Sequence, residues 1–471
     1  MVPWQASAIE LAGLFDRKAI SPVEVLETCL ARHARLNSRL NAVVALDRDG
    51  ARASAEKAEQ RMLSGSRLGV LDGVPITIKD NIFVKGLKVT WGSPLYRDFH
   101  PPHDDIAVHR LRAAGAVILG KTNTPEFAMA AYTDNPLFGP TRNPWDLRVT
   151  PGGSSGGGVA ALAAGIAPLT LGTDSGGSIR RPAAYTGVVG FKPSIGRIAR
   201  YHGFPPIAGD LQVIAPAART VADTKALYDI ISGPDPRDRA SMACESAEPP
   251  LSDSSSRLRI CYVPQIEGMP VDPEIRAALA FTAQQLSKLG HIVEESASPY
   301  ELAVIEGIWA TLSATGLARV VLKHPDWKEN VSPAIAAMCE RGSRYTATDY
   351  VAALDALVKF RADFVEIFRE TDVVLTPASA SLAWPIQVPY PAQIDGQDAG
   401  PRDAAVFSTF VNVAGLPAIS VPARTTATGL PIGIQLIATY GAENLLLTLA
   451  AELEAEEPWQ ARWPQIALEA A

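Results

Sequence analysis

Residues 152–183 read GGSSGGGVAALAAGIAPLTLGTDSGGSIRRPA, in which two glycine-rich turns enclose an apolar, alanine-rich run. Glycine at this density indicates backbone conformations or close approaches that a side chain would block. The apolar run predicts a helix over 157–164 and a strand over 169–171. Each turn contains a serine, Ser154 in the first and Ser178 in the second. The segment therefore predicts two hydroxyls held in backbone-rich loops beside regular elements.

Outward from this segment, strand and helix patterns alternate along most of the chain. Ser21 and Glu24 form a capping box before an amphipathic helix predicted over 22–39, and a second helical stretch follows at 51–63. Residues 73–79 predict a short buried strand, which places Lys79 at its end. A helix is predicted at 106–114, and further strands at 116–119, 188–191, 260–263, 292–294, 373–375, 418–421 and 434–437. This pattern predicts an α/β fold around a mixed sheet.

The overall composition is that of a folded globular protein. The 471 residues include 43 Lys and Arg against 50 Asp and Glu, with 47% hydrophobic and 20% charged residues. The net charge of −7 and the absence of a long basic run argue against a nucleic-acid partner. The first residues lack the pattern of a signal peptide, and the long uncharged stretch at 149–173 is too rich in glycine and serine for a membrane span. We therefore expect a cytoplasmic protein without a membrane partner.

Length alone suggests about three domains at roughly 150 residues each. No internal repeat is visible, and two segments rich in proline and polar residues, 232–257 and 377–402, read as exposed connections. We expect one elaborated domain over 1–471.

The four cysteines are too widely spaced to suggest a metal cage or a disulfide framework. Cys29, Cys244, Cys261 and Cys339 form no C-x-x-C pair. Buried free thiols are expected, and no metal site is predicted.

Four other catalytic or binding motifs compete for parts of the sequence. A phosphate-binding loop at 152–158 lacks the following Gly-Lys-Ser/Thr, and a dinucleotide fingerprint lacks its preceding strand. A G-x-S-x-G elbow with Ser154 as nucleophile would indicate an α/β-hydrolase, but the last histidine, His324, lies too early for its triad. The S-x-x-K motif at 54–57 has no S-D-N or K-T-G partner and reads as a solvated helix face. The α/β-hydrolase stays as a distant alternative.

The second turn places a hydroxyl after two glycines at a predicted helix start. Backbone N–H groups in such a turn can point at one spot, which is what a developing oxyanion requires. The competing interpretation is an ordinary capped turn.

Taken together, the two turns resemble the amidase signature family over 152–183, with Val159 as the one departure, where the family usually has a smaller residue. The resemblance continues through DGVPITIKD at 72–80, GKTN at 120–123, NPW at 143–145 and GLPAISVP at 415–422. The signature core would span about 70–200. This resemblance implies the amidase-signature fold, a central mixed β-sheet covered by helices on both faces.

The same resemblance implies a Ser–Ser–Lys triad that needs no cofactor. Ser178 would be the nucleophile, Ser154, with a cis peptide bond, the bridging hydroxyl, and Lys79 the base. The oxyanion hole would consist of the N–H groups of Ser175, Gly176, Gly177 and Ser178, worth about 3 kcal/mol each to the transition state. Ala128 and Met129, in the stretch 126–130, would contact the substrate, whereas Phe127 is equally consistent with core packing.

Simple chemistry is consistent with these roles. A lysine pKa is about 10.4 in water, so Lys79 can accept a proton near neutrality only if burial favours its neutral form. The end of an apolar strand behind a glycine-rich wall meets that need. Asp174 and Arg180 flank the second turn, either as a bracing ion pair or as a plain surface pair.

One branch of the family is the A subunit of the glutamyl-tRNA amidotransferase, which holds its glutamine with an aspartate. That aspartate lies seven residues before the asparagine that is Asn412 here, and this chain has Ala405 instead. A stand-alone hydrolase of small amides, aryl acylamides or carbamates, as a single chain or a homodimer, is therefore favoured over the tRNA-dependent branch. Residues 264–345 carry no family motif and are expected to set substrate choice. An inactive scaffold protein of a larger complex is the non-enzyme alternative.

Overall fold

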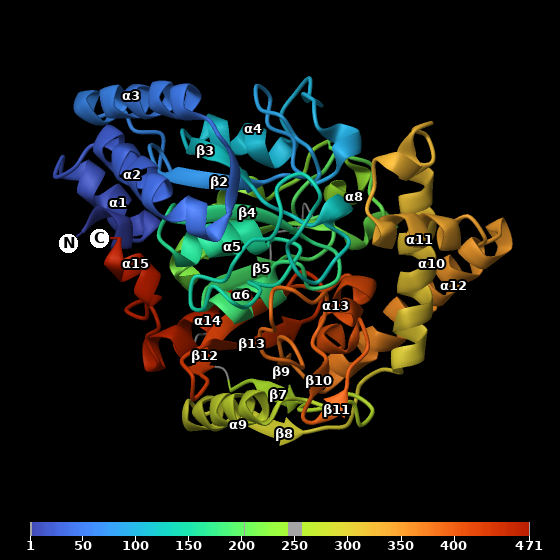
Figure 1. Ribbon diagram of the computed structural model, residues 1–471. Coiled ribbons are helices and arrows are strands. Elements are labelled where there is room, and N and C mark those ends of the chain that lie inside the picture. The colour runs from blue at the N-terminus through green and yellow to red at the C-terminus, as the bar shows by residue number, and fades with distance from the viewer. Residues whose placement is uncertain (1, 202, 244–256, 471) are drawn as a thin grey trace.

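The computed structural model describes residues 2–201, 203–243 and 257–470, and an eleven-stranded sheet runs through the middle of the molecule (Figure 1). Its strand order is β1-β3-β2-β4-β6-β5-β12-β13-β9-β7-β8. The strands are β1 (Val43–Leu46), β2 (Pro75–Lys79), β3 (Val117–Thr122), β4 (Leu169–Asp174), β5 (Val189–Lys192), β6 (Val213–Ala218), β7 (Arg259–Tyr262), β8 (Ile292–Glu295), β9 (Val373–Pro377), β12 (Ala418–Thr425) and β13 (Pro431–Ala438). One sheet thus contains strands from residue 43 to residue 438. The division into domains stays a prediction.

The sheet is mixed, as predicted. Strand β2 is parallel to β3 and to β4, and β7 is parallel to β8 and to β9. The remaining pairs are antiparallel, including β4 with β6 and β12 with β13. Parallel pairs need crossover connections, which the intervening helices supply.

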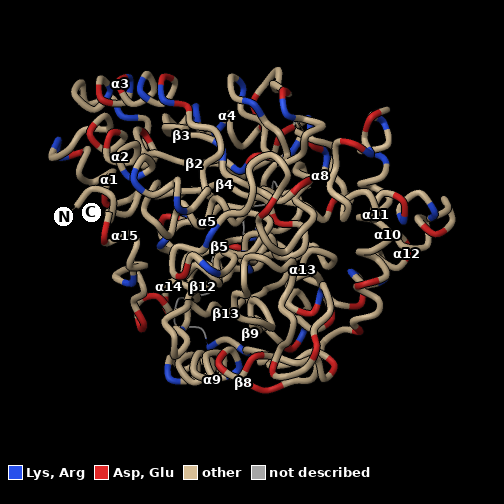
Figure 2. Tube along the Cα trace, viewed as in Figure 1, with Lys and Arg blue, Asp and Glu red and all other residues tan. Residues whose placement is uncertain are grey.

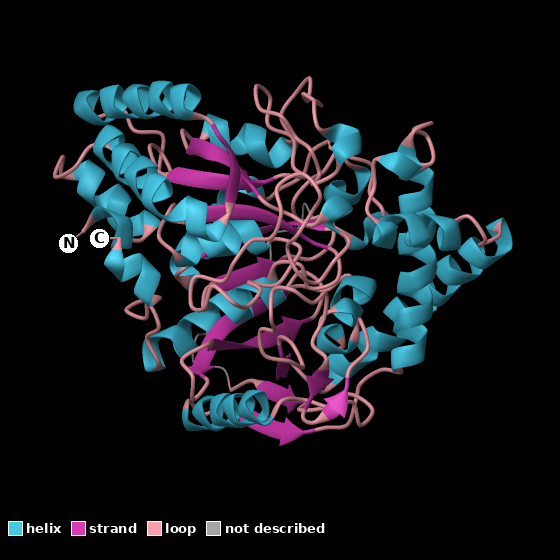
Figure 3. Cartoon of the chain, in the orientation of Figure 1, coloured by secondary structure: helices cyan, strands magenta, loops and turns pink. Residues whose placement is uncertain are grey.

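Helices flank the sheet on its two sides (Figure 3). They are α1 (Ala8–Asp16), α2 (Pro22–Leu40), α3 (Arg48–Ser64), α4 (Ile106–Ala113), α5 (Gly156–Ala163), α6 (Arg180–Thr186), α7 (Val221–Ile231), α8 (Arg239–Met242), α9 (Pro273–Lys288), α10 (Leu302–Val321), α11 (Pro333–Gly342), α12 (Ala347–Phe364), α13 (Thr409–Ala414), α14 (Glu443–Glu456) and α15 (Gln465–Glu469).

Strand β6 shows how both faces of the sheet are covered. Ala215 and Ala217 belong to a cluster with side chains of α5 and α6. Ile214 and Ala218 belong to the main apolar core, which also contains Leu227 of α7. Because successive side chains of a strand point to opposite faces, α5 and α6 cover one face of the sheet and α7 the other. The predicted fold class is confirmed.

Most predicted elements lie where the sequence placed them. The capping box at Ser21 begins α2, and β2 ends at Lys79. Two strands of the main sheet were not predicted, β1 and β6. Strand β6 contains Pro216 and three alanines, a composition that does not predict a strand. In the structure Pro216 pairs with Leu171 of β4 and lies beyond the residues of β6 that pair with β5. Proline is tolerated there because its missing N–H is not needed on that side.

The predicted connections are partly described. Residues 232–243 are mostly exposed or half-buried and include the short helix α8, whereas 244–256 lie outside the described residues. Within 377–402 the chain forms a small hairpin, β10 (Gln393–Ile394) with β11 (Gln397–Asp398), which the sequence did not predict. Residues 54–57 lie on α3, as the interpretation of a helix face requires.

The cysteines behave as expected where they are described. Cys29, Cys261 and Cys339 are free and buried, and Cys244 lies outside the described residues.

Helix α10 is long and apolar enough to cross a membrane by length and composition. In its most apolar window 61% of the residues are buried within the molecule, and a buried helix of a globular core passes the same test.

Candidate active site

The candidate site lies at the carboxyl ends of two neighbouring parallel strands. Lys79 is the last residue of β2, and Thr173 and Asp174 are the last residues of β4, which pairs with β2 in parallel. Parallel neighbours end at the same edge of a sheet, where α/β proteins commonly bind ligands. The register thus brings together residues 94 positions apart.

Lys79 is held by hydroxyl groups in a dry environment. Its Nζ lies 2.7 Å from Ser154 Oγ and 3.0 Å from Thr173 Oγ1, and the residue is 1% exposed. Asn81 Nδ2 donates to the same Thr173 oxygen at 3.0 Å. Burial lowers the pKa of Lys79 well below its ordinary value, and repulsion from Arg200 lowers it further, while Asp174 opposes the shift. The structure thus favours the neutral amine at this position.

The first glycine turn wraps closely around other backbone segments. A Cβ on Gly153 would lie 2.5 Å from the Tyr132 carbonyl oxygen, and one on Gly158 would lie 2.5 Å from Thr170 Oγ1. The glycines are therefore required by close approach, as the sequence predicts. The peptide bond between Gly153 and Ser154 is cis. Ser155 N donates to the Ser178 carbonyl oxygen at 3.0 Å, which ties this turn to the second one.

The second turn offers backbone donors beside Ser178. No acceptor among the described residues is bonded to the N–H groups of Ser175, Gly176 or Ser178. The N–H of Gly177 instead donates to Asp174 Oδ1 at 2.8 Å, so this member of the predicted oxyanion hole is already engaged. Gly177 has φ of 102°, a conformation that other residues rarely adopt. Ser178 is 7% exposed.

Asp174 and Arg180 form a buried ion pair. Arg180 Nε and Nη2 bind the two carboxylate oxygens of Asp174 at 3.0 and 2.9 Å, and both side chains are fully buried. The alternative of a plain surface pair is wrong. Burial alone would raise the pKa of Asp174, but the Arg180 guanidinium holds it below its usual range. A permanent carboxylate therefore organises the turn through Gly177 N and Ile179 N.

Residues from the C-terminal part of the chain complete this network. Arg180 also donates to Gln435 Oε1 and to Asn412 Oδ1, each at 2.6 Å, and Asn412 Nδ2 donates to Asp174 Oδ1 at 3.0 Å. Ser408 Oγ donates to the Gly176 carbonyl oxygen at 2.9 Å. The sequence patterns did not predict these roles. The available signal was a polar side chain inside an apolar strand, as for Gln435 on β13.

The stretch 126–130 has an unusual backbone. Phe127 and Ala128 have φ of 53° and 60°, in the left-handed region that is uncommon for residues other than glycine. Phe127 is 1% exposed and packs against Trp91, with ring centroids 5.3 Å apart, so core packing accounts for its side chain. Ala128 and Met129 are half-buried at the edge of the same aromatic cluster. Left-handed residues of this kind cluster at functional sites.

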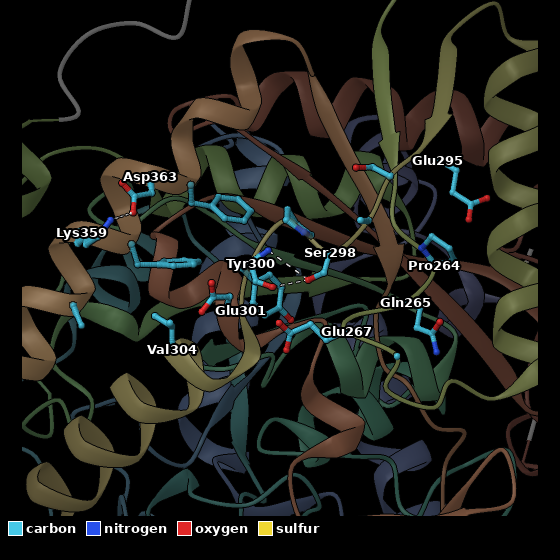
Figure 4. Close-up of a pocket in the computed structure, with 17 residues that line it drawn as sticks. Pro264, Gln265, Glu267, Glu295, Ser298, Tyr300, Glu301, Val304, Lys359 and Asp363 are labelled. Atoms are coloured by element: carbon cyan, nitrogen blue, oxygen red, sulfur yellow. Dashed lines mark hydrogen bonds and ion pairs between the residues drawn. The ribbon is translucent and has the colours of Figure 1, made fainter.

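Parts of the motif-free segment 264–345 reach these residues. Trp309 of α10 lies against Gly176, because a Cβ there would be 3.3 Å from Trp309 Cη2. Ser332 N, before α11, donates to Glu126 Oε2 at 3.0 Å. Other residues of the segment line a surface groove of about 1250 Å³ together with α12 (Figure 4). Its lining, which includes Glu267, Tyr300 and Lys359, contains none of the predicted site residues.

Charged residues of both signs are interspersed along the trace (Figure 2). In the described ranges no group of three or more His, Cys, Asp or Glu side chains is arranged to hold a metal ion.

Comparison with known proteins places the chain in a family. A family model described as Amidase matches residues 24–447. In Moorella thermoacetica, the A subunit of the glutamyl-tRNA(Gln) amidotransferase is 34% identical, over 98% of this chain and 98% of that protein. The chain belongs to the amidase family, which confirms the resemblance inferred from 152–183.

Solved structures of the same family have the same fold. A 6-aminohexanoate cyclic dimer hydrolase, complexed with substrate, matches with a TM-score of 0.87 at 30% identity, covering 99% of this chain and all of the other (100%). A bacterial aryl acylamidase of the amidase signature family matches with a TM-score of 0.89 at 28% identity, covering 99% and 98%. These findings support serine-dependent hydrolysis of an amide C–N bond as the chemistry of this chain. The α/β-hydrolase alternative is thereby dropped.

Proposed function

We propose that this protein hydrolyses a small amide through an acyl-enzyme, with Ser178 as nucleophile, Ser154 as bridging hydroxyl and Lys79 as general base. The observation that carries the proposal is the position of Lys79 Nζ, 2.7 Å from Ser154 Oγ and fully enclosed. A buried amine with a lowered pKa can accept a proton near neutral pH, which an exposed lysine cannot.

In the first half-reaction, the neutral amine of Lys79 takes the proton of Ser154 while Ser154 Oγ takes the proton of Ser178. The oxygen of Ser178 then bonds to the carbonyl carbon of the substrate. The N–H groups of Ser175, Gly176 and Ser178 would donate to the oxyanion. The C–N bond breaks as the proton returns through Ser154 to the leaving nitrogen.

In the second half-reaction, water attacks the acyl ester carbon. Its proton passes by the same relay to Lys79, and the ester C–O bond breaks as Ser178 regains a proton. The products are a carboxylate and an amine or ammonia.

Covalent labelling tests the nucleophile directly. A fluorophosphonate probe is expected to modify Ser178, and Ser178→Ala is expected to lose the label. Peptide mass spectrometry locates the adduct. An adduct on Ser154 or elsewhere in the wild-type protein would contradict the assignment, and Ser155→Ala serves as the neighbouring control.

A second candidate function is that of an amidotransferase A subunit, which the 34% identity to the Moorella thermoacetica protein favours. Against it, Ala405 is a buried alanine where that branch would place its glutamine-binding aspartate. The two candidates differ in their need for a partner. Ammonia release from simple amides by the purified chain supports the hydrolase, whereas glutamine turnover that requires tRNA and the other amidotransferase components supports the second candidate.

The substrate class in this proposal is a linear amide, an aryl acylamide or a carbamate. We propose that the enzyme works in the cytoplasm, alone or as a homodimer, with Ala128 and Met129 at the acyl group. A panel of chromogenic anilides and carbamates, read by amine release, tests this directly. Absence of any turnover together with stable association with another protein would favour a scaffold role.

A further inference from the structure

Arg181 is a buried cation that has no counter-ion among the residues that the structure describes. The residue is 6% exposed, and its Nε is buried with no hydrogen-bond partner in the described chain. Neither Arg181 nor Arg402 has a carboxylate within 4.0 Å among the described residues. The nearby Asp174 is already bound by Arg180 and by the backbone. Buried arginine side chains are normally paired, because an uncompensated buried charge is strongly destabilising.

The guanidinium lies directly against the turn that carries Ser178. A Cβ on Gly177 would be 3.0 Å from Arg181 Nε. Burial lowers the pKa of Arg181, and repulsion from Arg180 adds to the shift, whereas Tyr185 and Asp174 oppose it without cancelling it.

A second guanidinium lies near the same turn. Arg402 Cζ lies 5.1 Å from the ring centroid of Trp309, and Arg402 Nη2 donates to Thr409 Oγ1 at 2.9 Å. Trp309 Cη2 and Thr409 Oγ1 would lie 3.3 and 3.5 Å from a Cβ on Gly176. Arg402 is thus separated from Gly176 by a single side chain, whereas Arg181 lies directly beside Gly177.

The two cations are near enough to affect each other. Burial lowers the pKa of Arg402 to about 10, and repulsion from Arg181 contributes. The carboxylate that opposes this shift belongs to Glu306, which is exposed. An anion held between the guanidinium groups would relieve both the repulsion and the cost of burial.

We propose that Arg181 and Arg402 form a subsite for a carboxylate group on the substrate. The substrate is then an amide whose acyl part ends in a carboxylate, a short dicarboxylic acid monoamide. This inference rests on the proposed function, because Ser178 in the same turn is the proposed nucleophile. Arginine suits the role because its planar fork binds a carboxylate through two parallel hydrogen bonds.

The subsite is tested by the ratio of kcat/KM for a substrate that carries a carboxylate to kcat/KM for a neutral substrate of the same shape. Malonamate, succinamate and glutaramate are compared with 3-methylbutanamide, 4-methylpentanamide and 5-methylhexanamide, in which an isopropyl group replaces the carboxylate. For the chain length that fits best, kcat/KM is expected to be about 10- to 100-fold higher for the acid, since hydrogen bonds to charged groups contribute about 1.5–3 kcal/mol. Ammonia release is measured at several salt concentrations. Equal or better turnover of all three neutral amides would overturn the proposal.

Variants separate a carboxylate subsite from a general electrostatic effect. In Arg181→Met the acid-to-neutral ratio is expected to fall to near one, mainly through KM, and Arg181→Lys should restore part of it. Arg424→Met, at an exposed arginine stacked on Phe281, is the matched control and should keep the wild-type ratio. Loss of rate on both substrates with an unchanged ratio would show that Arg181 only supports the oxyanion, against the proposal. Circular dichroism checks folding, and Arg402→Met replaces Arg181→Met if the latter is unfolded.

Binding separates failure of the subsite from failure of the proposed function. Titration calorimetry with malonate, succinate and glutarate, against the corresponding diamides, needs no turnover. Dicarboxylate binding that is lost in Arg181→Met supports the subsite even if Ser178 is never labelled, in which case only the proposed nucleophile is wrong. Labelling of Ser178 without dicarboxylate binding, or binding that Arg181→Met leaves unchanged, overturns the subsite and leaves the hydrolase standing.

Discussion

The shared edge of β2 and β4 differs sharply from the surface of helix α12. At the edge, Lys79, Thr173 and Asp174 are almost completely buried, and each is bonded to other buried groups. On α12, Val351 and Val358 are 53% and 67% exposed. The first region is fixed by partners from four parts of the chain, whereas the second is constrained on one side only.

The difference indicates where chemistry and selectivity reside. A buried polar network tolerates little change, because loss of one partner leaves another group unsatisfied. A helix with one free face can change without such a penalty. Trp309 lies between these extremes, since α10 belongs to the motif-free segment but touches Gly176. Substitutions at the edge of β2 and β4, at Trp309 and on α12 should therefore differ in whether they change catalysis, stability or substrate preference, as well as in the size of the change.

The largest effect is expected for Lys79→Met. Removal of the base should lower kcat by about 10²- to 10⁴-fold, because general-base catalysis contributes on that order. Stopped assays of amine release measure the loss, and Lys79→Arg should not restore the rate because arginine stays protonated. A variant within ten-fold of wild type would remove Lys79 from the mechanism.

The pH profile examines the same residue in the wild-type enzyme. The pKa of Lys79 is lowered, so the active neutral form is present above that lowered pKa and is lost as the pH falls through it. We therefore expect kcat/KM to fall on acidification, with the midpoint well below the ordinary pKa of a lysine. Retention of that limb in Lys79→Met would assign it to another group.

The edge of the sheet was largely predictable from the sequence, and the selectivity region was not. Lys79 could be placed because a short apolar run ends at it, and both serines could be placed because glycine turns are visible locally. Asn412 and Gln435 reach Arg180 from 232 and 255 residues away, through strand order that local patterns do not encode. The engagement of Gly177 N by Asp174 depends on the fold of the turn, so family resemblance alone placed that N–H in the oxyanion hole.

The next effect concerns stability at the edge. Arg180→Met removes the counter-ion of a fully buried carboxylate, and it should lower the free energy of unfolding by about 3–5 kcal/mol. Urea denaturation followed by circular dichroism measures this loss. Lys225→Met breaks the exposed pair with Asp229 on α7 and should cost no more than about 0.5 kcal/mol. Similar losses in both variants would mean that the buried network is no more important than a surface pair.

A smaller effect, on substrate preference, is expected at Trp309. Trp309→Leu removes the ring that separates Arg402 from Gly176, and we expect substrate preference to change by about ten-fold, equivalent to 1.4 kcal/mol. The measurement is the ratio of kcat/KM for two amides that differ in their acyl group, with fluorophosphonate labelling of Ser178 as a control for an intact nucleophile. An unchanged ratio would place selectivity outside α10.

The smallest effect is expected on α12, where Val358→Ser changes a side chain that is 67% exposed. Away from partners, such a substitution usually alters stability by less than about 0.5 kcal/mol, and α12 carries none of the predicted site residues. Urea denaturation and amide hydrolysis should both match the wild type within error. Size-exclusion chromatography with light scattering of both proteins adds a sharper criterion. If the wild type is a dimer and Val358→Ser is a monomer, α12 forms the dimer interface. The exposed face of α12 would then be covered by a second copy of the chain, and substitutions on it would be constrained after all.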